Sequence, residues 1–297
     1  MYERHFGFKT KPFALTPDPE FLYESPQHAM AMTMLEYGLE SAAAFSLLTG
    51  DIGSGKTTLV RRLLRQLGDQ VTVGLVSNTH GHFKSIHGWA LSALGISPAN
   101  DSEIAKYEAL VESFVREYAK GRRTLLIFDE AQNLSIEVLE ELRLLSNVNS
   151  EKDLILQVLL VGQPELRAKL SLPELVQFAQ RISVDYHLRP LAGPDTHAYI
   201  QHRLEVAGGC KDLFLPEAIE CLYAHTNGVP RLLNQLADFA LVYAFADQRT
   251  SIDAELIAQV LRDRTTTYSL RTFSAVEPAA SPLDKKPGRR GKKAGAA

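Results

Sequence analysis

Short runs of apolar residues recur along the first two thirds of the chain, with longer segments of mixed polarity between them. The runs are rich in aliphatic and β-branched side chains, as strands buried on both faces of a parallel sheet are. The longer segments repeat apolar residues at spacings of three and four, which is typical of amphipathic helices. This alternation predicts an α/β fold with a parallel five-stranded sheet. The strands are expected at 44–49, 71–77, 124–128, 154–161 and 182–188.

Helices are expected between these strands and again after the last one. Those in the first part are expected at 27–41, 58–67, 86–94, 101–120, 135–147 and 173–180. Past Pro190 no strand pattern follows, and four more helices are expected at 195–206, 216–225, 229–245 and 253–262. A strand-free segment after an alternating one predicts a second, all-helical domain that begins near residues 190–194.

The two ends of the chain differ from both of these parts. Residues 1–25 are rich in aromatic residues and proline. Because proline at this density opposes a helix, we expect an extended arm packed on the domain. The C-terminal end lacks periodicity and is rich in Pro, Ala, Gly and Lys, which predicts a disordered basic tail. The expected division is an arm (1–25), an α/β domain (26–192), a helical domain (193–264) and a tail (265–297).

A glycine-rich loop joins the first expected strand to the helix that follows it. It reads Gly-Asp-Ile-Gly-Ser-Gly-Lys-Thr over residues 50–57 and matches G-x-x-x-x-G-K-[ST] at every fixed position. Such a loop lets backbone N–H groups converge on an anion, and the helix start adds its own N–H groups and positive dipole end. The full motif in this context favours phosphate binding over a plain Gly-Ser turn. Lys56 is expected to reach the β- and γ-phosphates of a nucleotide, and the Thr57 hydroxyl to hold Mg²⁺. The loop residues expected at the nucleotide are Gly50, Asp51, Ile52, Gly53, Ser54, Gly55, Lys56, Thr57 and Thr58.

The third expected strand ends in two acidic residues, Asp129 and Glu130. An apolar strand with this ending, downstream of the glycine loop, is typical of a nucleoside triphosphatase. Asp129 is expected to bind Mg²⁺ through its water shell. Glu130 is expected to orient and deprotonate the attacking water. With Gln132 the segment reads Asp-Glu-Ala-Gln, which also occurs in helicases.

Two further polar residues follow expected strands, Asn78 after the second and Gln163 after the fourth. In a parallel sheet the carboxyl ends of the strands lie at one edge, where ligands bind. Gln163 lies beside the γ-phosphate if its strand sits between the first and third strands; the alternative is a simple helix-capping turn.

Three more side chains are each open to two interpretations. Arg181 closes the short helix at 173–180, either to compensate the helix dipole or as a finger donated to a neighbouring subunit's nucleotide, and Arg189 is a second finger candidate. Arg231 lies at a helix start after a turn, either as a surface residue or as a sensor of the γ-phosphate. Phe6 in the arm either belongs to a hydrophobic strap or stacks on the adenine base.

Composition limits the class of protein and its location. The 297 residues carry a formal net charge of −3. Residues 282–297 hold six Lys or Arg against one Asp, a net +5, which leaves −8 for residues 1–281. Two cysteines without paired spacing, no apolar run of membrane-spanning length and no signal-peptide pattern predict a cytoplasmic protein. The basic end leaves contact with nucleic acid or anionic lipid open, although the acidic body does not favour nucleic acid.

Taken together, these motifs resemble an AAA+ ATPase of the ExeA/GspA-like family. The resemblance spans residues 2 to about 262 and rests on the opening at 2–25 and on the glycine loop. It also rests on Leu-Ile-Phe-Asp-Glu-Ala-Gln at 126–132, Gly-Gln-Pro-Glu-Leu at 162–166, Gln-Arg-Ile at 180–182 and Gly-Val-Pro-Arg at 228–231. The resemblance implies a P-loop NTPase (AAA+) fold whose helical domain is a C-terminal lid. It also implies ATP and Mg²⁺ as cofactors and hydrolysis of ATP to ADP and phosphate.

The resemblance implies a role for each of the remaining polar residues. Arg181 resembles the finger that acts in trans, and Arg231 resembles the sensor 2 arginine of the lid. Gln163 takes the sensor 1 place, which many AAA+ proteins fill with Asn, Thr or Ser. Asn78 resembles the polar residue that restrains the catalytic glutamate until a partner binds.

The resemblance also implies a homo-oligomer, a ring or filament, that powers or regulates secretion, polysaccharide export or pilus assembly in the cell envelope. A membrane-complex protein is the expected partner, with the ATPase peripheral at the inner membrane. We expect a short form, without the membrane span and peptidoglycan-binding domain of members named for secretion. The alternative is a DNA-associated ATPase that regulates transposition target selection. A helicase needs a second RecA-like domain, and a small-molecule kinase explains neither Arg181 nor the lid.

Overall fold

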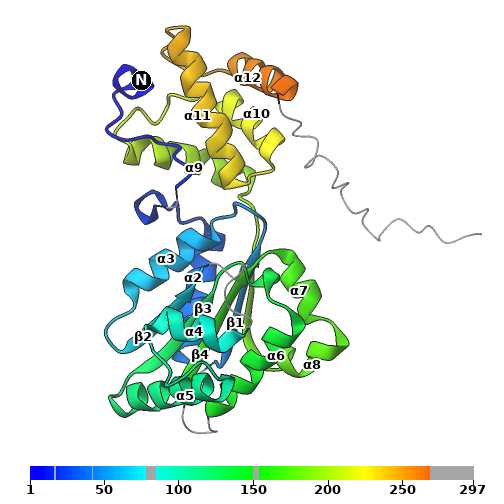
Figure 1. The fold of residues 1–297 in the computed structure, drawn as a ribbon. Helices are drawn as coiled ribbons and strands as arrows, with labels where there is room; N and C mark the ends of the chain where they lie inside the picture. The colour runs from blue at the N-terminus through cyan, green and yellow to red at the C-terminus, as the bar shows by residue number, and fades with distance from the viewer. Residues whose placement is uncertain (17, 42, 78–84, 150–153, 268–297) are drawn as a thin grey trace, which may run out of the picture.

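A computed structural model describes residues 1–16, 18–41, 43–77, 85–149 and 154–267 of the chain. Two parts are stacked along the long axis of the molecule, an α/β body and a smaller helical part (Figure 1). Asn78 and the expected tail from residue 268 onward lie outside the described residues. The last helix continues to Thr267, slightly past the boundary expected at 264.

The body contains a five-stranded sheet in the order β2-β3-β4-β1-β5, and every neighbouring pair of strands is parallel. The strands are β1 (Phe45–Gly50), β2 (Val71–Val76), β3 (Arg123–Phe128), β4 (Leu156–Gly162) and β5 (Ile182–Leu188). The predicted parallel five-stranded sheet is therefore confirmed. Strand β4 lies between β3 and β1, so the ends of these three strands are adjacent.

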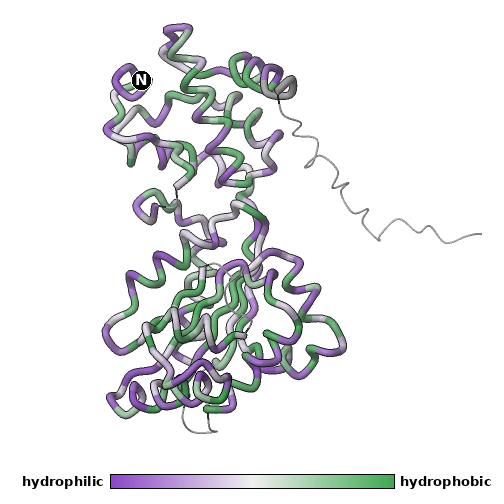
Figure 2. The backbone as a smooth tube through the Cα atoms, in the orientation of Figure 1, coloured by the Kyte–Doolittle hydropathy of each residue, from purple (hydrophilic) through white to green (hydrophobic). Residues whose placement is uncertain are grey.

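Helices cover both faces of the sheet because successive strand side chains point to opposite faces. Leu125 and Ile127 of β3 pack against α2 (Pro26–Glu40) and α3 (Lys56–Gln66). Leu126 and Phe128 face the opposite layer. That layer comprises α4 (Ile86–Leu94), α5 (Glu103–Ala119), α6 (Ile136–Leu145), α7 (Pro164–Leu170) and α8 (Val176–Ala179). Hydrophobic positions gather along the strands between these layers (Figure 2).

Two short helices differ from the sequence prediction. No residue range was predicted for helix α7, because its seven residues are too few to show a clear period. Its start is nevertheless typical, with Pro164 at a first-turn position where a missing N–H costs nothing. The single helix expected at 173–180 is a 3-10 turn, Pro173–Leu175, followed by α8.

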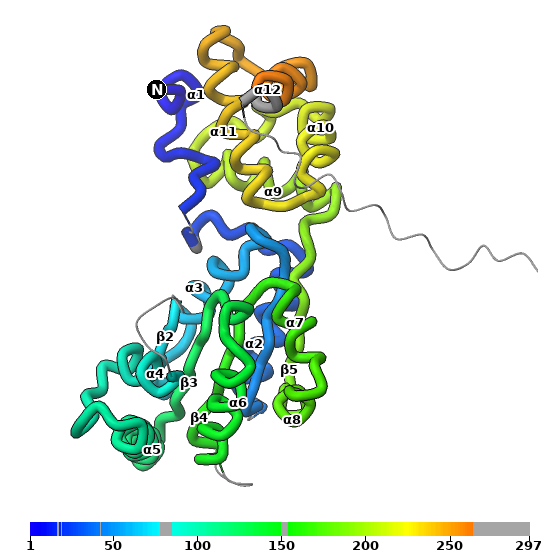
Figure 3. Tube along the Cα trace, turned by 45° about the vertical axis from the view of Figure 1, so that its right-hand side comes forward, coloured from blue at the N-terminus to red at the C-terminus, as the bar shows by residue number. Residues whose placement is uncertain are grey.

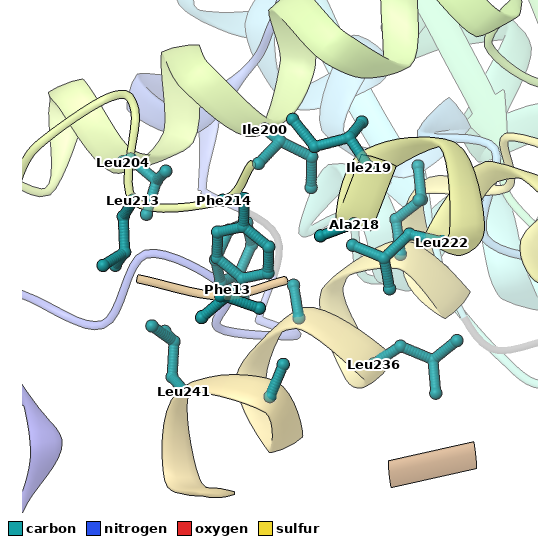
Figure 4. Close-up of a cluster of buried hydrophobic side chains, with 14 of the residues drawn as sticks. Phe13, Ile200, Leu204, Leu213, Phe214, Ala218, Ile219, Leu222, Leu236 and Leu241 are labelled. Atoms are coloured by element: carbon teal, nitrogen blue, oxygen red, sulfur yellow. The ribbon is translucent and has the colours of Figure 1, made fainter. Parts of the chain in front are cut away.

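The helical part contains α9 (Gly193–Val206), α10 (Pro216–Thr226), α11 (Pro230–Ala246) and α12 (Ala254–Thr267). Its core includes side chains from all four helices and from the N-terminal arm. Phe13 of the arm inserts beside Phe214, with the two ring centroids 5.7 Å apart (Figure 4).

The sequence predicts an extended arm, but part of the arm is helical. It begins with a helix, α1 (Tyr2–Phe6), which ends at Gly7 in the left-handed region (φ 73°). This helix precedes the first proline of the arm, Pro12, so the prolines do not oppose it. Tyr2, Phe8 and Phe13 are buried in the core of the helical part rather than in the α/β body. The arm then passes down to the body, so two segments connect the parts: the arm and the chain after β5 (Figure 3).

Candidate functional site

A cavity lies where the glycine loop, the arm and the helical part meet. The body contributes the loop, the start of α3 and the ends of β3 and β4 to its lining. The other side is formed by the arm, α9 and the start of α11. The body residues that line the cavity include Ile52, Gly53, Gly55, Lys56, Thr57, Thr58, Glu130 and Gln163.

The glycine loop has the backbone that a phosphate cradle needs. Gly53 and Gly55 have φ values of +81° and +102°, which glycine adopts without the strain that other residues incur. Gly55 is the N-cap of α3, so the free N–H groups of that helix open onto the loop. A loop and helix start with this geometry bind anions through backbone N–H groups.

Lys56, the first residue of α3, is folded onto this loop and is 8% exposed. Its Nζ donates hydrogen bonds to the carbonyl oxygens of Gly50 at 2.7 Å and Asp51 at 2.9 Å. Burial lowers the pKa of Lys56, and the carboxylates of Glu130 and Asp129 oppose this shift. The ammonium group thus lies in the loop with polar partners that an incoming phosphate can replace.

The two residues expected to hold Mg²⁺ lie side by side. Thr57 Oγ1 donates to Asp129 Oδ2 at 3.0 Å. The other carboxylate oxygen, Asp129 Oδ1, accepts from the Glu130 N–H at 2.9 Å. Burial raises the pKa of Asp129, while these two hydrogen bonds oppose the shift. Hydroxyl and carboxylate oxygens are hard ligands of the kind that Mg²⁺ prefers, so the pair fits this cation.

Glu130 is held by two glutamine side chains. Its backbone lies in the left-handed region (φ 55°), an uncommon conformation for a residue other than glycine. Its Oε2 accepts from Gln132 Nε2 at 2.6 Å and from Gln163 Nε2 at 3.2 Å. Gln132 also accepts from the Gln163 N–H at 3.0 Å. Sequence reasoning noted Gln132 only as part of Asp-Glu-Ala-Gln and did not assign it to the site.

Arg231 brings the helical part into contact with the glycine loop. Its N–H donates to the Gly53 carbonyl at 3.2 Å, and the residue lines the cavity. A Cβ at position 53 would lie 2.4 Å from Arg231 Cβ, so only glycine allows this approach. The side chain is exposed at the start of α11.

Phe6 does not line the cavity, which favours the hydrophobic strap over stacking on the base. It packs on the core of the helical part, beside Phe8 and His5. The physical reason is α1, which turns this end of the arm away to pack on α11. Later arm residues line the cavity instead: Ala14, Leu15, Thr16, Asp18, Phe21, Leu22 and Tyr23.

Arg181 is bonded within its own chain and is not among the cavity residues. Its Nη1 donates to the Arg143 carbonyl at 3.0 Å and to Ser146 Oγ at 2.7 Å, both at the end of α6. Arg189, directly after β5, is exposed. The two finger candidates therefore differ: Arg181 is held by hydrogen bonds within its own chain, whereas Arg189 is exposed.

His28 is a buried contact of the loop that sequence reasoning missed. It lies in the first turn of α2, is 4% exposed and lines the cavity. Its Nε2 lies 3.2 Å from the Ser54 carbonyl and its Nδ1 2.8 Å from Ser25 Oγ. A carbonyl only accepts, so Nε2 carries the proton. Burial lowers the pKa of His28, while the Ser54 hydrogen bond opposes the shift.

Comparisons with known proteins agree with this arrangement. Residues 39–170 match a family model described as an AAA domain. The fold is shared with the ORC2 protein of Aeropyrum pernix (ADPNP–ADP complexes), at TM-score 0.63 and 19% identity over 86% of this chain and 72% of that one. It is also shared with Cdc6p from Pyrobaculum aerophilum, at TM-score 0.64 and 16% identity over 85% and 70% of the two chains. Such low identities show the fold alone. With its glycine loop and acidic strand end, the chain belongs to the AAA+ P-loop ATPases.

Within that class the chain is related to a secretion protein. It is 38% identical over 247 residues to general secretion pathway protein A of Aeromonas hydrophila. The match covers 83% of this chain and 45% of the relative, so the chain spans less than half of that protein's length. The ExeA/GspA-like resemblance of the motifs is thereby confirmed.

Among the described residues, no helix is both long enough and apolar enough to cross a membrane.

Proposed function

We propose that the protein hydrolyses ATP to ADP and phosphate in this cavity, with Mg²⁺ held by Thr57 and Asp129. The observation that carries the proposal is the convergence of a buried lysine, a hydroxyl–carboxylate pair and a restrained glutamate on one glycine loop. The AAA domain and the P-loop fold support nucleotide hydrolysis as the class of activity.

The loop residues and Lys56 bind the triphosphate in this proposal. Backbone N–H groups of the loop and of the α3 start contact the β- and γ-phosphate oxygens. Lys56 Nζ exchanges its two loop carbonyls for phosphate oxygens, which gives its charge an ionic partner. Bound Mg²⁺ supplies further neutralisation of phosphate charge. Arg231 adds a positive charge from the helical part.

Glu130 aligns the attacking water and accepts its proton. Both glutamine amides donate to Oε2, which leaves Oε1 to accept a hydrogen bond from water. Gln163 touches the glutamate in this arrangement, so its proposed sensor role acts through Glu130. Asn78 keeps its proposed role as a restraint on the same carboxylate.

We further propose that residues 193–267, together with the arm packed on them, act as a lid over the nucleotide. The arm and the start of α11 both line the cavity and both belong to the helical part's packing. A change in the position of this lid therefore moves Arg231 relative to the loop.

A homo-oligomer, a ring or filament, would complete the site with a neighbouring subunit's arginine. Arg181 and Arg189 are the two candidates, and mixed complexes separate them. The variant that lacks the true finger, Arg181→Ala or Arg189→Ala, should regain activity when it is mixed with Lys56→Ala subunits, because its intact nucleotide site then receives the arginine of a Lys56→Ala neighbour. Failure of both mixtures to regain activity counts against a shared site.

The cellular role we propose is to power or regulate secretion, polysaccharide export or pilus assembly in the cell envelope. The supporting observation is the relation to general secretion pathway protein A. The protein would act in the cytoplasm, peripheral at the inner membrane through a membrane-complex partner. The alternative is a DNA-associated ATPase of transposition, which the basic C-terminal sequence favours.

Phosphate release measured with Mg²⁺-ATP tests both parts of the proposal. The wild-type protein should hydrolyse ATP, and the rate should not change when double-stranded DNA is added at low salt. Stimulation by DNA together with salt-sensitive DNA binding would favour the transposition role. No hydrolysis by the oligomer would contradict the enzymatic assignment.

A further inference from the structure

A second buried cation, from the helical part, lines the same cavity. Arg203 lies on α9 and is 7% exposed. Among the described residues no carboxylate forms an ion pair with it, which is unusual for a buried charge.

The guanidinium of Arg203 is bonded mainly to the arm. Nε donates to the Pro12 carbonyl at 2.5 Å, and Nη2 donates to the Ala14 carbonyl at 3.3 Å. Nη1 donates to Tyr199 Oη at 3.1 Å within α9. The group also lies over the Phe21 ring, with Cζ 4.9 Å from the ring centroid. The planar guanidinium group therefore holds two arm carbonyls and one arm ring in a single geometry.

Burying the charge of Arg203 costs free energy, and the apolar contacts of the arm with the helical core do not require a charge at this position. Phe13 already inserts into the helical core between the two bonded carbonyls. An apolar side chain at position 203 would avoid the desolvation cost of a buried cation. The hydrogen bonds to the arm offset that cost and define where the following residues lie.

The arm residues that follow form another part of the cavity wall. This wall contains Leu15, Phe21, Leu22 and Tyr23 from the arm, with Tyr199 from α9. Its side chains are mostly apolar or aromatic, and such surfaces suit a flat heteroaromatic base better than a triphosphate. Lys56 and the N–H groups that suit phosphates belong to the glycine loop and the start of α3.

We infer that Arg203 is a positioning residue for base recognition: it fixes the arm against α9 through Pro12, Ala14 and Phe21, and so forms the wall on which the base and ribose of the nucleotide bind. The inference rests on the proposed nucleotide binding. It assigns recognition of the base and recognition of the triphosphate to different parts of the cavity. Arg203 acts through the arm and contributes to the affinity for the base, whereas the glycine loop sets the affinity for the triphosphate.

The test compares two ligands that share the phosphate part, Mg²⁺-ATP and Mg²⁺-tripolyphosphate, by calorimetric titration of the full chain. Arg203→Gln should weaken ATP binding roughly tenfold or more, because hydrogen bonds to a charged donor are lost. Its affinity for tripolyphosphate should stay within about twofold of the wild-type value, because the loop is unchanged. Arg203→Lys keeps the charge but not the planar guanidinium. It should lose less affinity for ATP than Arg203→Gln and none for tripolyphosphate.

Arg249→Met is the matched control. Arg249 also lies in the helical part, but its guanidinium pairs with Asp247 and Asp253, away from the cavity. This variant should bind both ligands as the wild type does. Thermal melts of each variant check that the fold persists, and if Arg203→Gln does not fold, the selective loss must appear in Arg203→Lys.

Three outcomes overturn the inference. Unchanged ATP affinity in the folded variants means that the arm wall does not need Arg203. Equal losses for ATP and tripolyphosphate mean that Arg203 acts on the whole site rather than on the base. A wild-type protein that binds tripolyphosphate as tightly as ATP also contradicts the inference. If the wild type binds neither ligand, the proposed nucleotide site itself fails, which is a distinct result.

Discussion

The two sides of the cavity each contain a buried cation bonded to backbone carbonyls, but their surroundings differ. On the body side, Lys56 lies near the carboxylates of Asp129 and Glu130 and beside a hydroxyl. On the helical side, Arg203 lies among aromatic rings with no carboxylate partner among the described residues. One wall is suited to phosphate and a divalent cation, and the other to an uncharged ring.

This difference predicts that variants on the two sides fail in different ways. Changes on the body side should remove phosphate binding or hydrolysis, because charge and proton transfer are handled there. Changes on the helical side should alter affinity for the complete nucleotide, because the arm and α11 close over it. The following predictions run from the largest expected effect to the smallest.

Lys56→Ala should have the largest effect. Removing a charge that pairs with buried phosphate oxygens should weaken ATP binding by about 3 kcal/mol or more. Calorimetric titration with Mg²⁺-ATP measures the loss, and Lys106→Ala, which removes a lysine paired with Asp101 and Glu103 outside the cavity, is the control. ATP affinity within a few-fold of wild type would contradict the role assigned to Lys56.

Glu130→Gln should separate binding from chemistry. The amide cannot accept the proton of the attacking water, so the hydrolysis rate should fall by about 10²- to 10⁴-fold. ATP affinity should stay close to that of the wild type, because the loop and Lys56 are intact. Measured phosphate release at the wild-type rate would show that another group activates the water.

Gln132→Ala should slow hydrolysis by a smaller factor. It removes the 2.6 Å hydrogen bond that holds the Glu130 carboxylate but leaves Gln163 in contact with it. We expect the catalytic rate constant to fall about tenfold, with ATP affinity unchanged, since positioning errors act on the chemical step. Gln177→Ala, on the exposed face of α8, is the control. A loss of ATP affinity without a change in rate would contradict a role through Glu130.

His28→Gln should reduce the pH dependence of stability. Burial lowers the pKa of His28 in the folded chain below its ordinary value of 6.5, so the unfolded chain binds this proton first as the pH falls. The free energy of unfolding should therefore decrease as the pH is lowered through 6.5 towards the folded-state pKa.

Melting temperatures between pH 7 and pH 5 measure this slope. The wild type should lose stability over this range more steeply than His28→Gln. His187 and His202, whose pKa values are also lowered chiefly by burial, keep part of the slope in both proteins. The exposed His225 supplies the control variant, His225→Gln. Identical slopes for wild type and His28→Gln would contradict a His28 pKa lowered by burial.

The body side of the site was largely predictable from the sequence, because its geometry is local. The glycine loop is one continuous segment whose positive φ values require glycine at 53 and 55. The parallel sheet then brings the acidic end of β3 to the same edge. The motif and the alternation of strands and helices were enough to predict both.

Apart from Arg231, the helical side could not be predicted, because contacts between distant residues build it. Arg203 bonds to Pro12, which lies 191 positions earlier, and no local pattern indicates this pair. Phe6 was chosen because it is aromatic and precedes the loop, but α1 carries it to the helical core. Gln132 was overlooked because its partner Gln163 lies 31 positions away at the end of another strand.

A crystal structure with Mg²⁺ and a non-hydrolysable ATP analogue tests the central claim most directly. We expect the phosphates on the loop N–H groups with Lys56 Nζ at the β- and γ-oxygens. We also expect Mg²⁺ beside Thr57 and Asp129, and the base against the arm between Leu15 and Tyr23. A nucleotide bound elsewhere, or phosphates on the loop with the base turned away from the arm, would contradict a cavity shared between the two walls.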